Sequence, residues 1–227
     1  MNKDFSKINF VLDFDSTFVK LEGLEEFANI ALCGNPEKEI ILSHIYDITN
    51  LGMTGKISFE ESLNRRIKLF QPQSNQLGEL VKLLKSNITN SIEQNINFFR
   101  RNSSNIYVIS GGFMEWILPV LVPYEIPAKN IFANEFLYSN FNEIRGIDLN
   151  KPLSKSGGKV ATVASLNLSS PTIVVGDGYT DFEIRKAGVA DKFVMFAENI
   201  HRPIIENLAD LVVKDWNELL QRIDEIL

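Results

Sequence analysis

The sequence has little cysteine. Its 227 residues include one, Cys33. A single cysteine excludes an intramolecular disulfide, and with it the class of small secreted domains that are held together by cross-links. We expect Cys33 to be a small buried apolar side chain rather than a reactive thiol.

Positive charge and long apolar runs are also scarce. Lys and Arg number 23 against 29 Asp and Glu, which gives a net charge of −6, and the isoelectric point is about 5.1. Without a basic stripe, nucleic acid is not expected as the main partner. No apolar run approaches the length of a membrane span, and residues 1–7 lack the apolar stretch of a signal peptide. We expect a cytoplasmic protein with no membrane partner, and association into a homodimer stays open.

Three short apolar runs share one pattern. Residues 10–12 lead into Asp13, residues 106–109 into Ser110, and residues 172–175 into a segment containing Asp177. Each run is rich in β-branched or aromatic residues and too short for a helix, as is typical of buried strands in a parallel sheet. Two further strands are expected at 131–136 and 192–196. Helices are expected at 160–168, 182–187 and, at the end of the chain, 216–227. This alternation predicts an α/β fold with a doubly wound, mainly parallel sheet.

One long stretch interrupts the alternation. Residues 22–84 contain no convincing strand, and four segments in it favour helices: 24–31, 37–48, 59–70 and 77–84. We predict a helical cap of residues 20–88, inserted after the first strand into an α/β core made of residues 1–19 and 89–227.

The polar residues at the strand ends are expected to converge. Ligands of open α/β sheets bind beyond the carboxyl ends of the strands, where Asp13, Ser110 and Asp177 are predicted to lie. Asp13 and Asp15 are two apart, so in extended chain they point to the same side, and two close carboxylates repel unless a cation intervenes. A lone Asp-x-Asp is usually a turn or a helix cap, but convergence with Asp177 favours a metal site. Ligands that are all oxygen favour Mg²⁺.

Three other features keep alternatives open. The turn expected at Ser110-Gly111-Gly112 offers a hydroxyl and backbone N–H groups to an anion, but it can equally be a plain strand-to-helix turn. Lys159 opens a predicted helix and can reach back to a phosphate, but it can also be a plain surface lysine, and Lys151 and Lys155 are nearby competitors. Asp181 lies four residues after Asp177, and capping of the next helix is the alternative to a role in the site.

Together these residues resemble four motifs of the haloacid dehalogenase superfamily of phosphatases, in the family order. Asp13 to Thr17 is similar to its Asp-x-Asp-x-Thr motif, Ser110 to its second motif, Lys159 to its third, and the segment from Gly176 to Asp181 to its fourth. Thr180 stands where several members have asparagine. The resemblance implies a Rossmann-like core.

The insert resembles that of the phosphoserine phosphatase group. The group has a glutamate nine residues after the nucleophile, which is Glu22 here. Its cap carries a Met-x-Gly-Lys-x-x-Phe stretch followed by an arginine, which this sequence matches with Met53, Gly55, Lys56, Phe59 and Arg66. The resemblance implies that Arg66 binds a substrate carboxylate and that Glu22 binds its ammonium group.

The resemblance also implies a mechanism and a substrate. Asp13 is the nucleophile and Asp15 the general acid and base. Mg²⁺ is held by Asp13, Asp177 and the backbone carbonyl of Asp15, and the substrate is bound by Glu22, Met53, Phe59, Arg66, Ser110, Gly111, Lys159 and Thr180. The expected reaction is hydrolysis of L-phosphoserine through an aspartyl-phosphate. The alternatives are another small phosphomonoester, or phosphoryl transfer to an alcohol such as homoserine. A catalytically silent binding protein is disfavoured because Asp13 and Asp15 are both present.

Overall fold

A six-stranded parallel sheet forms the centre of the protein. The computed structural model describes residues 4–169 and 171–227. The strand order is β3-β2-β1-β6-β7-β8, and all the neighbouring strands run parallel. The strands are β1 (Asn9–Leu12), β2 (Ile106–Phe113), β3 (Ile131–Asn134), β6 (Thr172–Gly176), β7 (Lys192–Phe196) and β8 (Leu211–Val213). The order places β1 between β2 and β6, so the three predicted polar strand ends are neighbours.

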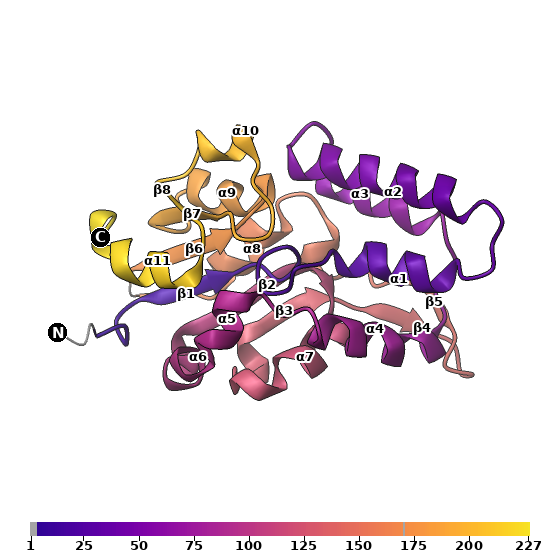
Figure 1. Ribbon diagram of the computed structural model, residues 1–227, viewed down its shortest axis with the longest axis horizontal. Helices are drawn as coiled ribbons and strands as arrows, with labels where there is room; N and C mark the ends of the chain where they lie inside the picture. The colour runs from indigo at the N-terminus through magenta and orange to yellow at the C-terminus, as the bar shows by residue number, and fades with distance from the viewer. Residues whose placement is uncertain (1–3, 170) are drawn as a thin grey trace.

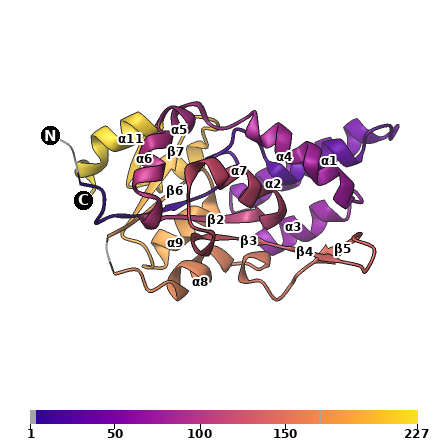
Figure 2. The same ribbon diagram turned by 90° about the horizontal axis from the view of Figure 1, so that it is seen from below.

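Helices cover both faces of this sheet, which confirms the doubly wound α/β class. Alternate strand residues face opposite helical layers: Phe10 and Leu12 belong to one apolar cluster and Val11 to another. Figure 2 shows the two layers on either side of the strands. One layer contains α5 (Asn90–Gln94), α6 (Ile96–Arg101), α7 (Met114–Leu121) and α11 (Trp216–Arg222), and the other contains α8 (Gly158–Ser165) and α9 (Tyr179–Lys186). Among the described residues, no helix combines the length and apolar character needed to cross a membrane.

The structure corrects the expected strand ends. The prediction of a turn at Ser110-Gly111-Gly112 was wrong. Strand β2 continues through these residues to Phe113, with an irregular register against β3. The strand expected at 131–136 ends at Asn134, and Phe136 instead begins a separate antiparallel pair, β4 (Phe136–Tyr138) and β5 (Ile144–Ile147). The three-residue strand β8 is too short to show a pattern in the sequence.

Cys33 was also predicted wrongly. It is exposed, not buried. It follows α1 (Gly23–Ala31) in a turn that leads to Gly34, and the buried position there belongs to Leu32.

The inserted segment is helical, as predicted: residues 22–84 contain α1, α2 (Lys38–Met53), α3 (Phe59–Ile67) and α4 (Leu77–Lys85), and no strand. Figure 1 shows α2 and α3 lying together beyond the core, on the side of α1. Ile45 of α2 and Leu63 of α3 nevertheless share an apolar cluster with Trp116 of α7, as do Phe27 of α1 and Leu84 of α4. All four helices of the insert therefore contribute to the same hydrophobic core.

The chain enters and leaves the insert side by side. Val19 and Ile88 form an isolated antiparallel bridge, and the Lys20 amide donates to the Asn87 carbonyl at 2.8 Å. The predicted boundaries at 19/20 and 88/89 lie at this pair of crossings. The division into a core and a cap stays a prediction.

Gly158 tests how tightly the start of α8 is packed. A Cβ at this position would lie 2.2 Å from the carbonyl oxygen of Pro152 and 2.8 Å from Cα of Leu153. We expect Gly158→Ala to lower the free energy of unfolding by about 1–3 kcal/mol, because backbone atoms must move. Gly78, in α4, has nothing within 4 Å of such an atom, and Gly78→Ala should raise it by roughly 0.5–1 kcal/mol. Urea denaturation measures both, and equal effects at the two positions would contradict the packing argument.

Candidate active site

Three buried carboxylates meet at the carboxyl ends of two adjacent strands. Asp13 follows β1, Asp177 follows β6, and Asp181 lies in the first turn of α9. They have one carboxylate oxygen each within 4.8 Å of the others, and their exposures are 4%, 0% and 1%. The Asp13 amide donates a hydrogen bond to the Val175 carbonyl at 3.0 Å. The backbone pairing between β1 and β6 therefore holds Asp13 in place at the end of β1.

Two buried cations pair with these carboxylates. The amine of Lys159 lies 2.8 Å from Oδ1 of Asp13 and 2.7 Å from Oδ1 of Asp181. Nε of Arg202 lies 2.8 Å from Oδ2 of Asp177. Burial alone would lower the pKa of Lys159, but Asp13 and Asp181 together raise it above its usual range. Lys159 is therefore charged, and the site has three carboxylates against two cations.

Within the described part of the chain, the two cations do not fully balance the three carboxylates. Burial raises the pKa of Asp177 to about 7, although Arg202 opposes the shift. Burial, followed by the field of Asp13, raises the pKa of Asp181 well above its usual range. Among the described residues, Oδ1 of Asp177 is buried without a hydrogen-bond partner. An unpartnered carboxylate oxygen inside a cluster of like charges is what a hard cation binds, so these residues fit a metal ion.

Asp181 both caps the next helix and belongs to the site, the two roles that the sequence left open. Its Oδ2 accepts a hydrogen bond from the Gly178 amide at 3.2 Å, at the start of α9. Its Oδ1 holds Lys159. A Cβ on Gly176 would lie 2.3 Å from the Asp181 carboxylate, so the glycine before Asp177 lets this side chain fold over β6.

Asp15 is not a member of the three-carboxylate cluster and has its own hydrogen-bond partner. Its Oδ1 accepts a hydrogen bond from the Gly23 amide at 2.8 Å. Burial, and then the charges of Glu22 and Asp13, raise the pKa of Asp15 well above its usual range. A carboxyl group whose pKa is raised holds its proton more readily, which suits it to donate the proton to a leaving group. The carbonyl of Asp15 as a metal ligand stays a prediction.

The glycines after Ser110 make room for other side chains. Ser110 is fully buried, and its Oγ accepts a hydrogen bond from the Gly112 amide at 2.9 Å. A Cβ on Gly111 would lie 2.5 Å from the Phe59 ring, and one on Gly112 would lie 3.0 Å from Oδ2 of Asp15. Close approach, rather than a turn, accounts for the two glycines.

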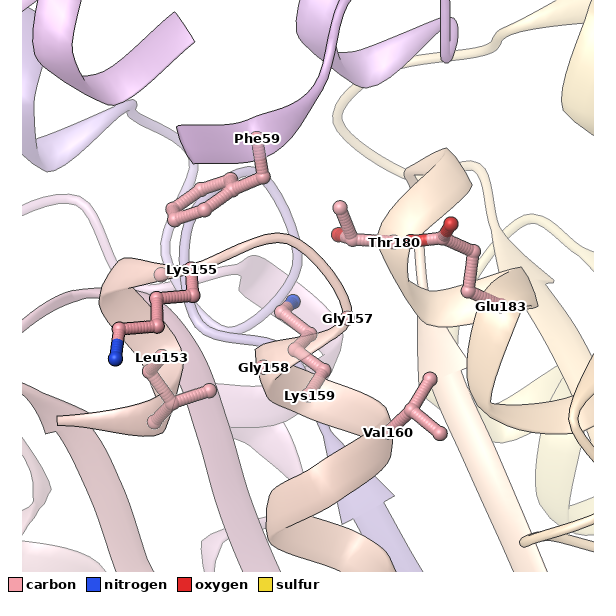
Figure 3. A pocket seen from close by; sticks show the side chains of 10 residues that line it. Phe59, Leu153, Lys155, Gly157, Gly158, Lys159, Val160, Thr180 and Glu183 are labelled. Carbon is pink, nitrogen blue, oxygen red and sulfur yellow. The ribbon is translucent and has the colours of Figure 1, made fainter. Parts of the chain in front are cut away.

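The structure distinguishes the two candidate lysines by position. Figure 3 shows the Lys159 side chain pointing toward Phe59 of the cap, while the amine of Lys155 points away from it. Lys155 is exposed, whereas Lys159 is 7% exposed and touches Asp13. Thr180 lines the same pocket from α9. Only Lys159 of the two lies beside the predicted nucleophile.

A cavity of about 560 Å³, counting its open mouth, lies between the helical insert and the ends of the sheet. It is lined by nine of the predicted site residues: Asp13, Asp15, Glu22, Met53, Phe59, Arg66, Gly111, Lys159 and Thr180. The other two, Ser110 and Asp177, are fully buried. The structure thus brings the predicted phosphate and amino-acid ligands to one small chamber.

Arg66 and Glu22 are the charged cap-side groups of this chamber. Arg66 is 7% exposed, and its Nη1 donates to the Thr49 hydroxyl at 3.2 Å. Burial lowers the pKa of Arg66, while nearby Glu22, Glu25 and Asp15 oppose the shift. Glu22 is held by the Ser16 hydroxyl, which donates to it at 2.6 Å.

The sequence did not single out Arg202, Glu25 or Thr49. Arg202 bonds Asp177 and also reaches Oδ1 of Asn50 in the cap at 3.4 Å. Glu25 is 5% exposed and lies near Arg66, whose charge opposes the rise in the Glu25 pKa that burial causes. The Thr49 hydroxyl accepts from Arg66 and donates to the Ile45 carbonyl. No local pattern marks these positions, because each acts on residues that are distant in the chain.

The fold and the site define a class. A parallel sheet of this order, with a buried carboxylate cluster at its central strand ends, a lysine between two of the carboxylates and a helical insert after the first strand, is that of a haloacid dehalogenase-type hydrolase.

Comparison with known proteins identifies the family within this class. The chain is 34% identical over 215 residues to the chloroplastic phosphoserine phosphatase of Arabidopsis thaliana, covering 93% of this chain and 70% of that one. It is 30% identical over 216 residues to the phosphoserine phosphatase of Homo sapiens, covering 94% and 92%. A phosphoserine phosphohydrolase-like protein from Francisella tularensis has a similar structure, with a TM-score of 0.86, 32% identity, and coverage of 95% of this chain and 99% of that one. No family model matches the chain. The chain belongs to the phosphoserine phosphatase family.

Glu25 predicts how stability depends on pH. Burial, and then the charge of Glu22, raise its pKa from 4.5 to about 7. The folded protein keeps this proton up to about pH 7, while the unfolded chain loses it near 4.5, so rising pH lowers the free energy of unfolding between these values. In Glu25→Gln, the free energy of unfolding should fall by about 3 kcal/mol less over this pH range than in the unsubstituted protein.

Urea denaturation of both proteins from pH 4 to pH 8 measures the difference. Glu26→Gln is the matched control, since Glu26 is a less buried neighbour on α1. Parallel stability curves for Glu25→Gln and the unsubstituted protein would show that Glu25 ionises normally in the fold.

Proposed function

We propose that this protein hydrolyses L-phosphoserine to serine and phosphate, with Mg²⁺ and through an aspartyl-phosphate on Asp13. One observation carries the proposal. The cavity that contains Asp13 and Asp15 is also lined by Arg66 and Glu22. A nucleophile, an acid, a cation for a carboxylate and an anion for an ammonium group therefore face the same small space.

The core residues supply the chemistry. Asp13 attacks phosphorus, and the bond to the serine oxygen breaks as Asp15 donates its proton to that oxygen. Asp15 then takes a proton from the water that cleaves the aspartyl-phosphate, which restores both groups. Lys159, Ser110 and the Gly111 backbone stabilise the negative charge of the phosphoryl group. Bound Mg²⁺, for which Asp13, Asp177 and the carbonyl of Asp15 are the proposed ligands, would reduce the repulsion between Asp13 and the phosphate dianion.

The cap residues supply the selection. Burial removes water from Arg66, so a substrate carboxylate that pairs with it gains more than it would at the surface. Glu22 offers its carboxylate to the ammonium group of the same molecule. Met53 and Phe59 close the chamber: Sδ of Met53 lies 3.2 Å from the place of a Cβ on Gly178, and Phe59 lies over Gly111. The substrate class is thus a small phosphorylated amino acid.

The family names support this substrate. The Arabidopsis and human relatives are both named phosphoserine phosphatase. Action on another small phosphomonoester, or transfer to an alcohol such as homoserine, is separated from it by the assays below. A cytoplasmic location and a homodimer stay predictions.

Asp13→Asn tests the nucleophile. We expect the protein with Mg²⁺ to release phosphate from L-phosphoserine, chelation with EDTA to stop the reaction, and Asp13→Asn to reduce kcat by at least about a thousandfold, because an amide does not attack phosphorus. Phosphate release measures all three. Asp47→Asn, at an exposed site on α2, is the control and should keep full activity. Near-normal turnover by Asp13→Asn would overturn the assignment.

Arg66→Ala tests the substrate. We expect KM for L-phosphoserine to rise by roughly 10–100-fold, because the variant loses a hydrogen bond to a charged group and such a bond contributes about this factor to binding. Hydrolysis of an aryl phosphate without a carboxylate should continue at a similar rate. Arg65→Ala is the matched control, because Arg65 is half-exposed and pairs only with Glu61 among the described residues. An equal loss on both substrates would show that Arg66 does not read the amino-acid part.

A further inference from the structure

Asn199 joins the chain segments that enter and leave the insert. It lies in the loop between β7 and α10 (Pro203–Glu206). Its side-chain amide donates to the Thr89 hydroxyl at 2.7 Å and to the Ser16 carbonyl at 3.1 Å, with the carbonyls of Thr17 and Val19 at 3.4 and 3.5 Å. One amide group thus contacts both crossings between core and insert.

Thr89 completes the same network from the second crossing. Its hydroxyl donates to the Thr17 carbonyl at 2.6 Å, and its amide donates to the Phe18 carbonyl at 3.0 Å. Thr89 is fully buried. Buried carbonyls need such donors, so Asn199 and Thr89 together satisfy the backbone just after the nucleophile.

That backbone is in a conformation that needs support. Ser16 has a φ of 54°, in the left-handed region that a residue other than glycine adopts at a cost. Ser16 follows Asp15 directly, and its hydroxyl donates to Glu22. Release of the Ser16 carbonyl would let this residue relax, and Glu22 would lose its position over the chamber.

The loop that carries Asn199 is itself fixed at both sides. The Ala197 amide bonds the Val213 carbonyl at 2.8 Å. Glu198 accepts hydrogen bonds from the amide and hydroxyl of Ser91, and Arg202 pairs with Asp177 at 2.8 Å. Asn199 therefore extends from a loop that is bonded to the sheet and to α5, and not from the insert.

We propose that Asn199 is a positioning residue: it fixes the Ser16–Glu22 segment and both crossings relative to the core, and so holds Glu22 where the substrate ammonium group binds. The last part rests on the proposed function. Asn199 does not touch the reacting atoms. Asp13 is held separately by Lys159 and the Phe14 amide, so its own position does not depend on Asn199.

Hydrogen exchange tests the structural part without any substrate. In Asn199→Ala and Thr89→Val, the amides of Ser16, Lys20 and Thr89, which bond carbonyls at the crossings, should exchange at least about tenfold faster, while β2 and β6 remain protected. Thr89→Ser keeps the hydroxyl and should restore protection. Asn207→Ala is the control, since Asn207 is exposed and donates only to Pro203 among the described residues. Unchanged exchange at the crossings in Asn199→Ala would overturn the proposal.

Kinetics test the functional part. A second variant, Asn199→Asp, keeps the shape of the side chain but replaces the donating amide with a carboxylate that faces carbonyl oxygens. Both Asn199→Ala and Asn199→Asp should raise KM for L-phosphoserine by about tenfold or more. Their kcat for an aryl phosphate should stay within about threefold, because Asp13 keeps its contacts. A fall in kcat on both substrates with unchanged KM would overturn the positioning role. If the unsubstituted protein cleaves aryl phosphate but not phosphoserine, the proposed substrate fails, and the exchange experiment still decides whether Asn199 fixes the crossings.

Discussion

Lys159 lies between two buried carboxylates, 2.8 Å from Asp13 and 2.7 Å from Asp181, and the rest of the site depends on this contact. Burying carboxylates beside one another is unfavourable unless cations are buried with them. Lys159 and Arg202 supply part of the compensation, and the unpartnered oxygen of Asp177 leaves a place for a metal ion. The sheet order makes the cluster possible, because it sets the ends of β1 and β6 next to each other.

The closed chamber depends on glycines as much as on charged residues. Phe59 of the cap lies over Gly111, Met53 lies over Gly178, and a Cβ on Gly55 would meet the ring of Tyr179 at 2.8 Å. At each of these contacts a large side chain packs against a glycine, where any side chain would crowd it. The helical insert therefore reaches the backbone at the ends of the sheet, and the space left between them suits a small molecule.

Much of the fold and most of the site could be predicted from the sequence, because the signals are local. Strands β1 and β6 are short apolar runs that lead into polar or glycine residues, β7 is a further apolar run, and the four helices of the insert have their own apolar periodicity. The end of β2 was placed wrongly because Gly111 and Gly112 look like a turn, although they provide space for Phe59 and Asp15. Cys33 was expected to be buried because its residue type usually is, but its place in a turn after α1 exposes it.

The sequence by itself determined where the carboxylates stand relative to the strands, and hence the class of chemistry, because residues at strand ends are carried to one edge of a parallel sheet. Only the tertiary structure decided that Lys159 rather than Lys155 reaches Asp13, and that Asp181 belongs to the carboxylate cluster. It also decided that Arg202 links Asp177 to Asn50 of the insert, and that Asn199 bonds the Ser16 carbonyl, after the nucleophile. These are contacts between residues 22 to 183 positions apart in the chain. Such pairs leave no periodic pattern, since the path of the chain between them determines whether they meet.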